Sequence, residues 1–152
     1  SNTDPPQQAS AKLSEFFIAI GAKPPNTLSR ALSEDFFFGI HVVDKNSLVL
    51  VIPVVSYDHA FAGMLEWEPT MNSSLAPAFT AVPGLIYDAN GIPTQRVFSD
   101  NVLRNYDVRE LKDDSGQVRL YYSFPSPRLL IIAESPYSFP ELLSRLQSMQ
   151  RI

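Results

Sequence analysis

Apolar residues recur at helical spacing near the start of the chain. The first stripe consists of Leu13, Phe16, Phe17 and Ile20. This spacing predicts an amphipathic helix that Ser10 can cap and that Gly21 can end. A short second helix is predicted from about Thr27. Its expected buried residues are Leu28, Ala31 and Leu32.

The segment from Ser56 to Phe79 contains the longest helical pattern. Ser56 is placed to cap this helix, and Pro69 is expected to end or kink it. The predicted inner face contains Ala60, Phe61, Met64 and Leu65, with Trp67 beside them. A separate short piece is then expected from residues 72–74, with Leu75 and Phe79 buried.

The end of the chain predicts a further helix with a strong start signal. Residues 138–141 read Ser-Phe-Pro-Glu, a capping box in which Ser138 and Glu141 satisfy each other's amides. The apolar stripe that follows consists of Phe139, Leu142, Leu143, Leu146 and Met149.

Runs rich in β-branched and aromatic residues lie between these helices. The predicted strands are 36–43, 48–55, 97–103, 106–111, 118–124 and 129–132. Turn residues at 44–47 and 113–116 join neighbouring runs, and Pro53 should lie near a strand end. Residues 80–95 give only turn signals around a short apolar run.

The order of these elements predicts an α+β fold with an antiparallel or mixed sheet, covered mainly on one face by amphipathic helices. Each half contains a hairpin whose apolar strand leads through a serine into a helix, as in LVIPVVSYDHAF and LLIIAESPYSF. This parallel suggests two similar halves. We expect one domain over residues 10–152. Residues 1–9 are expected to be a linker, with Ser1–Asn2 typical of a cleaved expression tag.

Composition narrows the possible functions of this domain. The chain has 152 residues, of which 45% are hydrophobic and 18% charged, so it can bury a core. A net charge of −4 disfavours binding to nucleic acids or anionic membranes. The absence of cysteine excludes disulfides and a thiol nucleophile. No apolar run reaches the length of a membrane span, so attachment to a membrane would need an anchor outside this segment.

The candidate ligand or partner surface is the start and middle of the 56–79 segment. Its residues are Tyr57, His59, Trp67 and Glu68. A metal site would need His59 and a second ligand such as His41, but no metal-binding spacing accompanies either histidine. Residues two apart on a helix, such as Glu66 and Glu68, face different ways. Solvated glutamates beside a packed tryptophan are therefore favoured over paired catalytic carboxylates.

Other catalytic signals are missing from the sequence. No serine lies in G-x-S-x-G or S-x-x-K, and no Gly-rich phosphate loop occurs. We therefore predict no catalytic residues, no metal and no cofactor. The basic residues of the last third are interleaved with acidic ones, which favours cross-strand ion pairs over an RNA-binding sheet that would use Tyr121 and Tyr122.

One pattern in the chain carries a family resemblance. Its residues are Phe61–Leu65, Trp67–Glu68, Met71, Leu75, Pro77 and Phe79, followed by Asn105, Asp107–Arg109, Gly116, Tyr122–Phe124 and Leu130–Ile132. This pattern, over residues 34–149, resembles an uncharacterised family of proteins from small-genome candidate-phylum bacteria. In that family such a domain follows a membrane anchor and a Pro-rich linker. The resemblance implies an extracytoplasmic domain tethered to the cytoplasmic membrane, and it supplies no activity.

Together these features predict a non-enzymatic interaction domain of an envelope-anchored protein. Its expected partner is another protein, and the domain itself should be a monomer or weak dimer. The alternative function is a small hydrolase or ligand-binding domain with a cleft near His59, Trp67 and Glu68. The alternative location is the cytoplasm.

Overall fold

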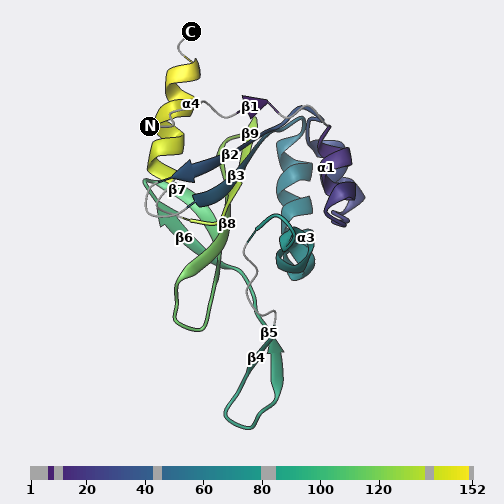
Figure 1. Ribbon diagram of the computed structural model, residues 1–152, viewed down its shortest axis with the longest axis vertical. Helices are drawn as coiled ribbons and strands as arrows, with labels where there is room; N and C mark the ends of the chain where they lie inside the picture. Colours follow the sequence, from purple (N-terminus) through teal and green to yellow (C-terminus); the bar gives the residue numbers. More distant parts are fainter. Residues whose placement is uncertain (1–6, 9–11, 43–45, 80–84, 136–138, 151–152) are drawn as a thin grey trace.

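The computed structural model describes residues 7–8, 12–42, 46–79, 85–135 and 139–150. The chain has the predicted α+β fold, built on one seven-stranded sheet in which every neighbouring pair is antiparallel (Figure 1). In spatial order its strands are β1 (Gln7–Gln8), β2 (Phe37–Val42), β3 (Asn46–Pro53), β9 (Leu129–Ala133), β8 (Val118–Ser126), β7 (Tyr106–Lys112) and β6 (Ser99–Leu103). The six predicted strands are confirmed, and Pro53 ends β3 as expected.

Helices lie on both faces of the sheet. Three pack on one face: α1 (Leu13–Ala19), α2 (Asn26–Ala31) and α3 (Tyr57–Leu75). The fourth helix, α4 (Phe139–Gln150), packs on the opposite face. The sheet is therefore covered on a second face as well, because alternate residues of its central strands are apolar on both sides. Among the described helices none is long and apolar enough to cross a membrane.

Two buried clusters correspond to the two faces. The larger lies under α1–α3 and includes Leu50, Ile52, Trp67, Tyr122, Leu130 and Ile132. The smaller lies under α4 and includes Val49, Val51, Tyr121, Ile131, Phe139 and Leu143. The apolar runs of β3 and β9 thus supply alternate residues to both clusters, as expected for strands at the centre of a sheet.

The two halves of the chain meet at the centre of the sheet, where β3 pairs with β9. The helix that follows β3 and the helix that follows β9 lie on opposite faces. A two-fold axis through an antiparallel strand pair would place both helices on one face. The two halves are therefore alike in element order but are not related by such an axis.

The start of α1 differs from the prediction. Lys12 occupies the N-cap position and provides no side-chain cap, whereas Ser10 lies outside the described residues. The exposed amides are instead satisfied by Glu34, whose main-chain oxygen accepts from Leu13 N and whose carboxylate accepts from Ser14 N at 3.1 Å. This cap comes from a residue distant in sequence, so local pattern could not predict it. The predicted cap of α4, Ser138, also lies outside the described residues. Phe139, Leu142 and Leu143 are buried as predicted, Leu146 is half-buried, and the side chain of Met149 is not among those described.

Helix α3 runs on past Pro69 to Leu75, so of the two predicted outcomes, an end or a kink, the end is wrong, and residues 72–74 belong to the same helix and do not start a separate piece. Proline cannot donate to the preceding turn, which normally destabilises a helix interior. Here Pro69 is exposed, and its carbonyl accepts a hydrogen bond from the Gln95 side chain at 2.8 Å. The buried stripe also continues beyond it through Met71 and Leu75, so packing holds the last turns in place.

The inner face of α3 is rotated relative to the predicted one. Its buried residues are Ala60, Gly63, Met64, Trp67, Met71 and Leu75. Phe61 and Leu65, which were expected inside, are 39% and 40% exposed. The reason is Gly63, which turns its bare backbone towards α2 and so brings the helix against Leu28.

Replacing Gly63 with alanine is expected to lower the free energy of unfolding by about 1–3 kcal/mol. A Cβ atom at this position would lie 2.6 Å from Leu28 Cβ and 2.8 Å from Leu28 Cα. Helix propensity alone predicts the opposite sign, since alanine in a helix interior is normally better than glycine by about 1 kcal/mol. Chemical denaturation followed by circular dichroism measures the sign. Stabilisation by this variant would contradict the close packing of α2 on α3.

Candidate functional site

A row of three polar side chains crosses the sheet on the face that carries α3. Asp100 on β6 is paired in register with Arg109 on β7, and Arg109 is paired with Tyr122 on β8. Directly opposed residues of antiparallel strands point to the same face and lie close enough to interact. Arg109 Nη1 accordingly contacts Asp100 Oδ1 at 2.9 Å. The predicted cross-strand ion pairing is therefore confirmed at this position.

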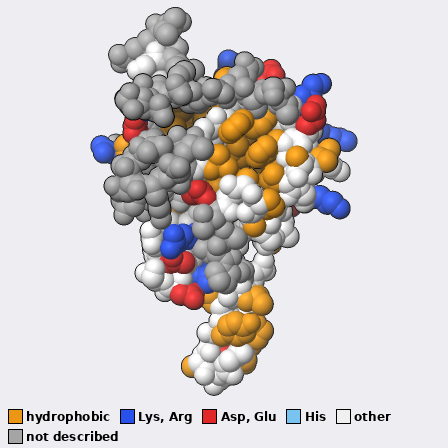
Figure 2. Space-filling view, viewed as in Figure 1, with side chains coloured by type: hydrophobic (Ala, Val, Ile, Leu, Met, Phe, Trp, Pro, Cys, Tyr) orange, Lys and Arg blue, Asp and Glu red, His pale blue; other side chains and the backbone are white. Residues whose placement is uncertain are grey.

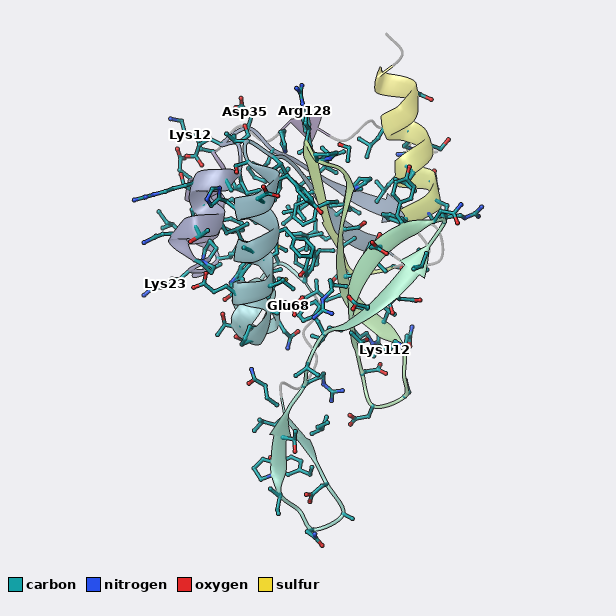
Figure 3. All side chains as sticks on the ribbon, turned by 180° about the vertical axis from the view of Figure 1, so that it is seen from behind. Lys12, Lys23, Asp35, Glu68, Lys112 and Arg128 are labelled. Carbon is teal, nitrogen blue, oxygen red and sulfur yellow. The ribbon has the colours of Figure 1, made fainter. Side chains whose placement is uncertain are left out.

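Helix α3 adds a fourth group to this row. Glu68 points from α3 towards the sheet (Figure 3). Its carboxylate accepts two hydrogen bonds from Arg109, from Nε at 2.8 Å and from Nη2 at 2.7 Å. It also accepts a hydrogen bond from the Tyr122 hydroxyl at 2.6 Å. A two-point contact between guanidinium and carboxylate fixes geometry as well as charge, so these bonds hold α3 to β7 and β8.

The four groups satisfy one another in a partly enclosed setting. The side chains of Glu68 and Arg109 are only 12% and 23% exposed. Hydrogen bonding to Glu68 is the main reason that the pKa of Arg109 is raised above its ordinary value. Burial, and then the hydrogen bond to Glu68, raise the pKa of Tyr122 well above 10. Arg109 is thus held charged and Tyr122 neutral, so neither is poised to exchange a proton near neutral pH.

Beside this network lies a groove of about 430 Å³. It opens where α3 stops covering the sheet, over β6, β7 and β8. Phe61 of α3 and Phe124 of β8 form one wall, and their ring centroids are 6.0 Å apart. The remaining lining includes Asp100, Val102, Asp107 and Arg109. The groove is therefore part aromatic and part acidic, and one of its boundaries is the outermost strand.

Strand β6 is that boundary, and it is last in the strand order. No described strand pairs with its outer edge. The Val102 amide donates to the side-chain oxygen of its neighbour Asn101 at 2.8 Å. The same Asn101 side chain donates to Glu110 at 3.1 Å. The Asn101 side chain thus occupies the Val102 amide, which is a main-chain group on the edge strand, and occupied edge groups are less open to pairing with another chain.

The four predicted surface residues do not form one site. His59 is exposed at the start of α3, where its ring Nδ1 lies 2.8 Å from Ser56 Oγ. That contact replaces the expected cap, because Ser56 is at the N-cap position without a side-chain bond to the helix amides. Trp67 is 1% exposed and packs edge-on against Phe17 in the core. The packed tryptophan agrees with the prediction, and neither His59 nor Trp67 lines the two hollows described in this subsection.

Tyr57 and Glu68 come closer to the groove. Tyr57 packs edge-on against Phe124, with ring centroids 5.3 Å apart, and so extends the aromatic wall. Glu68 does not line the groove, but it binds Arg109, which does, and it lines the smaller hollow described below. The expectation that Glu68 is solvated is wrong, because the residue beside the buried Trp67 is turned towards the sheet. Glu66 is exposed, as expected.

Sequence reasoning missed the residues of the sheet that complete this region. The sequence predicts Asp100 and Arg109 only as members of cross-strand ion pairs, Phe124 only as a strand residue, and Tyr122 as a possible RNA-contacting ring. Tyr121 and Tyr122 are both buried, so neither offers a face for base stacking. Alternation within each strand places Arg109 and Phe124 on fixed faces, but only the strand order shows that these faces adjoin Glu68.

Residues 85–95, which belong to the segment predicted to contain only turns around a short apolar run, carry a second exposed apolar surface. Here β4 (Leu85–Tyr87) and β5 (Pro93–Gln95) form a two-stranded arm that projects from the body (Figures 1 and 2). Its exposed apolar residues are Leu85, Ile86, Tyr87 and Ile92. A smaller hollow of about 250 Å³, lined in part by Glu68 and Gln95, lies where the arm meets α3. A two-stranded hairpin buries little by itself, so these side chains are open to solvent.

No group of three or more His, Asp or Glu side chains in the described ranges is arranged to hold a metal ion. The groove instead combines three features. Its floor carries the ion pair of Arg109 with Asp100, its wall is formed by Phe61 and Phe124, and its boundary is the outer edge of β6, with which no described strand pairs. Comparison of the chain with protein-family models, with curated proteins and with solved structures finds no match.

Proposed function

We propose that this chain is a non-enzymatic interaction domain that binds an extended segment of a protein partner along β6, with side chains of that segment entering the adjacent groove. The observation that carries the proposal is the position of the groove directly beside an unpaired edge strand. Strand addition gives affinity through main-chain hydrogen bonds and specificity through pockets for alternate side chains. The Phe61–Phe124 wall supplies such a pocket, and β6 supplies an outer edge with which no described strand pairs. A strand added there would take over the Val102 amide from the Asn101 side chain.

The hydrogen bonds beside the groove support a binding role in preference to catalysis. Glu68 accepts hydrogen bonds from both Arg109 and Tyr122. General acid–base or nucleophilic catalysis needs a group free to exchange a proton or attack a substrate. These three side chains are instead committed to joining α3 to the sheet. The projecting arm, with its exposed apolar residues, further supports an interaction role.

We also propose that the domain acts outside the cytoplasmic membrane, as part of an anchored protein. The family resemblance supports this location independently of the groove. A chain without cysteine is compatible with an exported domain and equally with a cytosolic one.

Selection of peptides from a random 12-residue phage library tests the binding proposal. We expect enriched peptides to bind the wild-type domain and to bind the Phe61→Ser variant at least about tenfold more weakly, because Phe61 is one wall of the groove. The matched control is Leu65→Ser. Leu65 has almost the same exposure on the same helix but does not line the groove.

Isothermal titration calorimetry measures the affinities, and circular dichroism confirms that both variants remain folded. If no peptide is enriched, or if Phe61→Ser binds as well as Leu65→Ser, the proposed function is overturned.

A further inference from the structure

The groove beside β6 has the charge of a site for a cation. Its charged lining residues are Asp100, Asp107 and Arg109. Arg109 already has two carboxylate partners, because it forms ion pairs with both Glu68 and Asp100. Counting Glu68, three carboxylates therefore accompany one guanidinium. An incoming acidic group would meet net negative charge, whereas a basic group would find it complementary.

Asp107 is the acidic group best placed to receive such a charge. Its side chain is exposed and makes no hydrogen bond or ion pair with any other described residue. Its main-chain oxygen accepts a hydrogen bond from Ser123 Oγ at 2.8 Å, which fixes the backbone from which the carboxylate projects. The carboxylate can therefore accept a new partner without breaking an existing ion pair.

The residue between Asp107 and the strand edge is apolar. Val102 is paired in register with Asp107, lies on the same face, and is 58% exposed. A side chain that reaches Asp107 from a strand added to β6 must pass over Val102. Lysine and arginine suit this path, because their methylene groups can cover apolar surface while the charged end reaches a polar partner.

The wall of the groove adds a second attraction for a cation. Phe61, Phe124 and Tyr57 form an aromatic cluster in which each pair of ring centroids lies within 6.0 Å. The faces of aromatic rings attract ammonium and guanidinium groups. Aliphatic side chains would contact these rings equally well, but they would leave Asp107 without a counter-charge.

We propose that the groove recognises a lysine or arginine side chain of the bound segment, with its methylene groups on Val102, its charge at Asp107 and its end beside the aromatic cluster. This inference rests on the proposed function and specifies the chemistry of its partner. It adds a requirement that strand addition alone does not impose, namely one basic residue facing the groove.

The test uses the peptides selected on the wild-type domain. We expect the enriched sequences to share a lysine or arginine, and its replacement by norleucine to weaken binding about five- to tenfold. Asp107→Asn should weaken binding of the basic peptide by a similar factor and leave binding of the norleucine peptide unchanged. The control is Asp35→Asn, which removes the same charge at an exposed position that does not line the groove.

The outcomes separate this inference from the function on which it rests. Two results would overturn the basic-residue inference and leave the binding function intact. In the first, the selected peptides depend on Phe61 but share no basic residue. In the second, they bind the Asp107→Asn variant as tightly as the Asp35→Asn variant. Equal losses for the basic and norleucine peptides with Asp107→Asn would also overturn it, because the variant would then act through something other than charge. Failure to select any peptide overturns both.

Discussion

Replacing Trp67 with alanine is expected to lower the free energy of unfolding by about 3–5 kcal/mol. Trp67 is 1% exposed and packs against Phe17 under α1, so its removal leaves a large cavity between α1, α3 and the sheet. The loss should be measured by guanidinium chloride denaturation and circular dichroism. Tryptophan fluorescence cannot follow this variant, because Trp67 is the only tryptophan in the chain.

Two further variants make this prediction specific. Leu65→Ala removes a side chain of the same helix that is 40% exposed, and it should cost less than about 1 kcal/mol. Trp67→Phe should cost much less than Trp67→Ala. Phenylalanine fills part of the space, and the buried indole nitrogen has no hydrogen-bond partner among the described residues. A Trp67→Ala variant as stable as the wild type would mean that the tryptophan is a surface group instead of a core residue.

Replacing Arg109 with methionine is expected to lower the free energy of unfolding by about 2–3 kcal/mol. The variant keeps the length of the side chain but removes both hydrogen bonds to Glu68, whose carboxylate is only 12% exposed. The remaining hydrogen bond from Tyr122 cannot supply a counter-charge. A carboxylate left without its cation in this setting costs more than the net strength of the intact pair.

A double-mutant cycle with Glu68→Gln isolates this effect. The double variant should be more stable than Arg109→Met alone, because it no longer contains an orphaned carboxylate. Arg145→Met is the exposed counterpart, since Arg145 and Glu141 are both 46% exposed at 2.8 Å on α4. Its cost should stay below about 0.5 kcal/mol. Equal costs for Arg109→Met and Arg145→Met would show that the network does not hold α3 to the sheet.

Local patterns predicted most of the fold. Alternation of apolar and polar residues, together with continuous apolar runs, predicted the six long strands. Helical spacing of apolar residues predicted α2 and the buried residues of α4. They failed at α3, where Phe61 and Leu65 were placed inside. Periodicity shows that a helix has an apolar stripe, but it cannot show which of two neighbouring apolar residues is buried. The orientation of α3 depends on the contact between Gly63 and Leu28, which lie 35 positions apart in the chain. The prediction that Pro69 could end the helix fails for a similar reason, since packing of the buried residues on both sides of Pro69 sustains α3.

The groove could be predicted only in part. Tyr57 and Glu68 belong to the most distinctive segment of the sequence, and each contacts a residue that lines the groove: Tyr57 packs on Phe124, and Glu68 binds Arg109. Arg109, Asp107 and Val102 carry no local signal, because a charged residue in a strand is ordinarily a solvated one. Their role depends on β6 being the last strand and on α3 leaving it uncovered, and both are properties of topology.

The pairing of β3 with β9 bears on the way the chain acquires its fold during synthesis. Val49 pairs with Ala133, so the middle of the sheet forms between segments made far apart in time. Until β9 has emerged from the ribosome, the apolar edge of β3 lacks its native neighbour, and closing so long a loop is slow. Exposed apolar edges invite pairing with other chains. The period between synthesis of these two strands is therefore when a nascent copy is most vulnerable to aggregation, and when a chaperone would help it most.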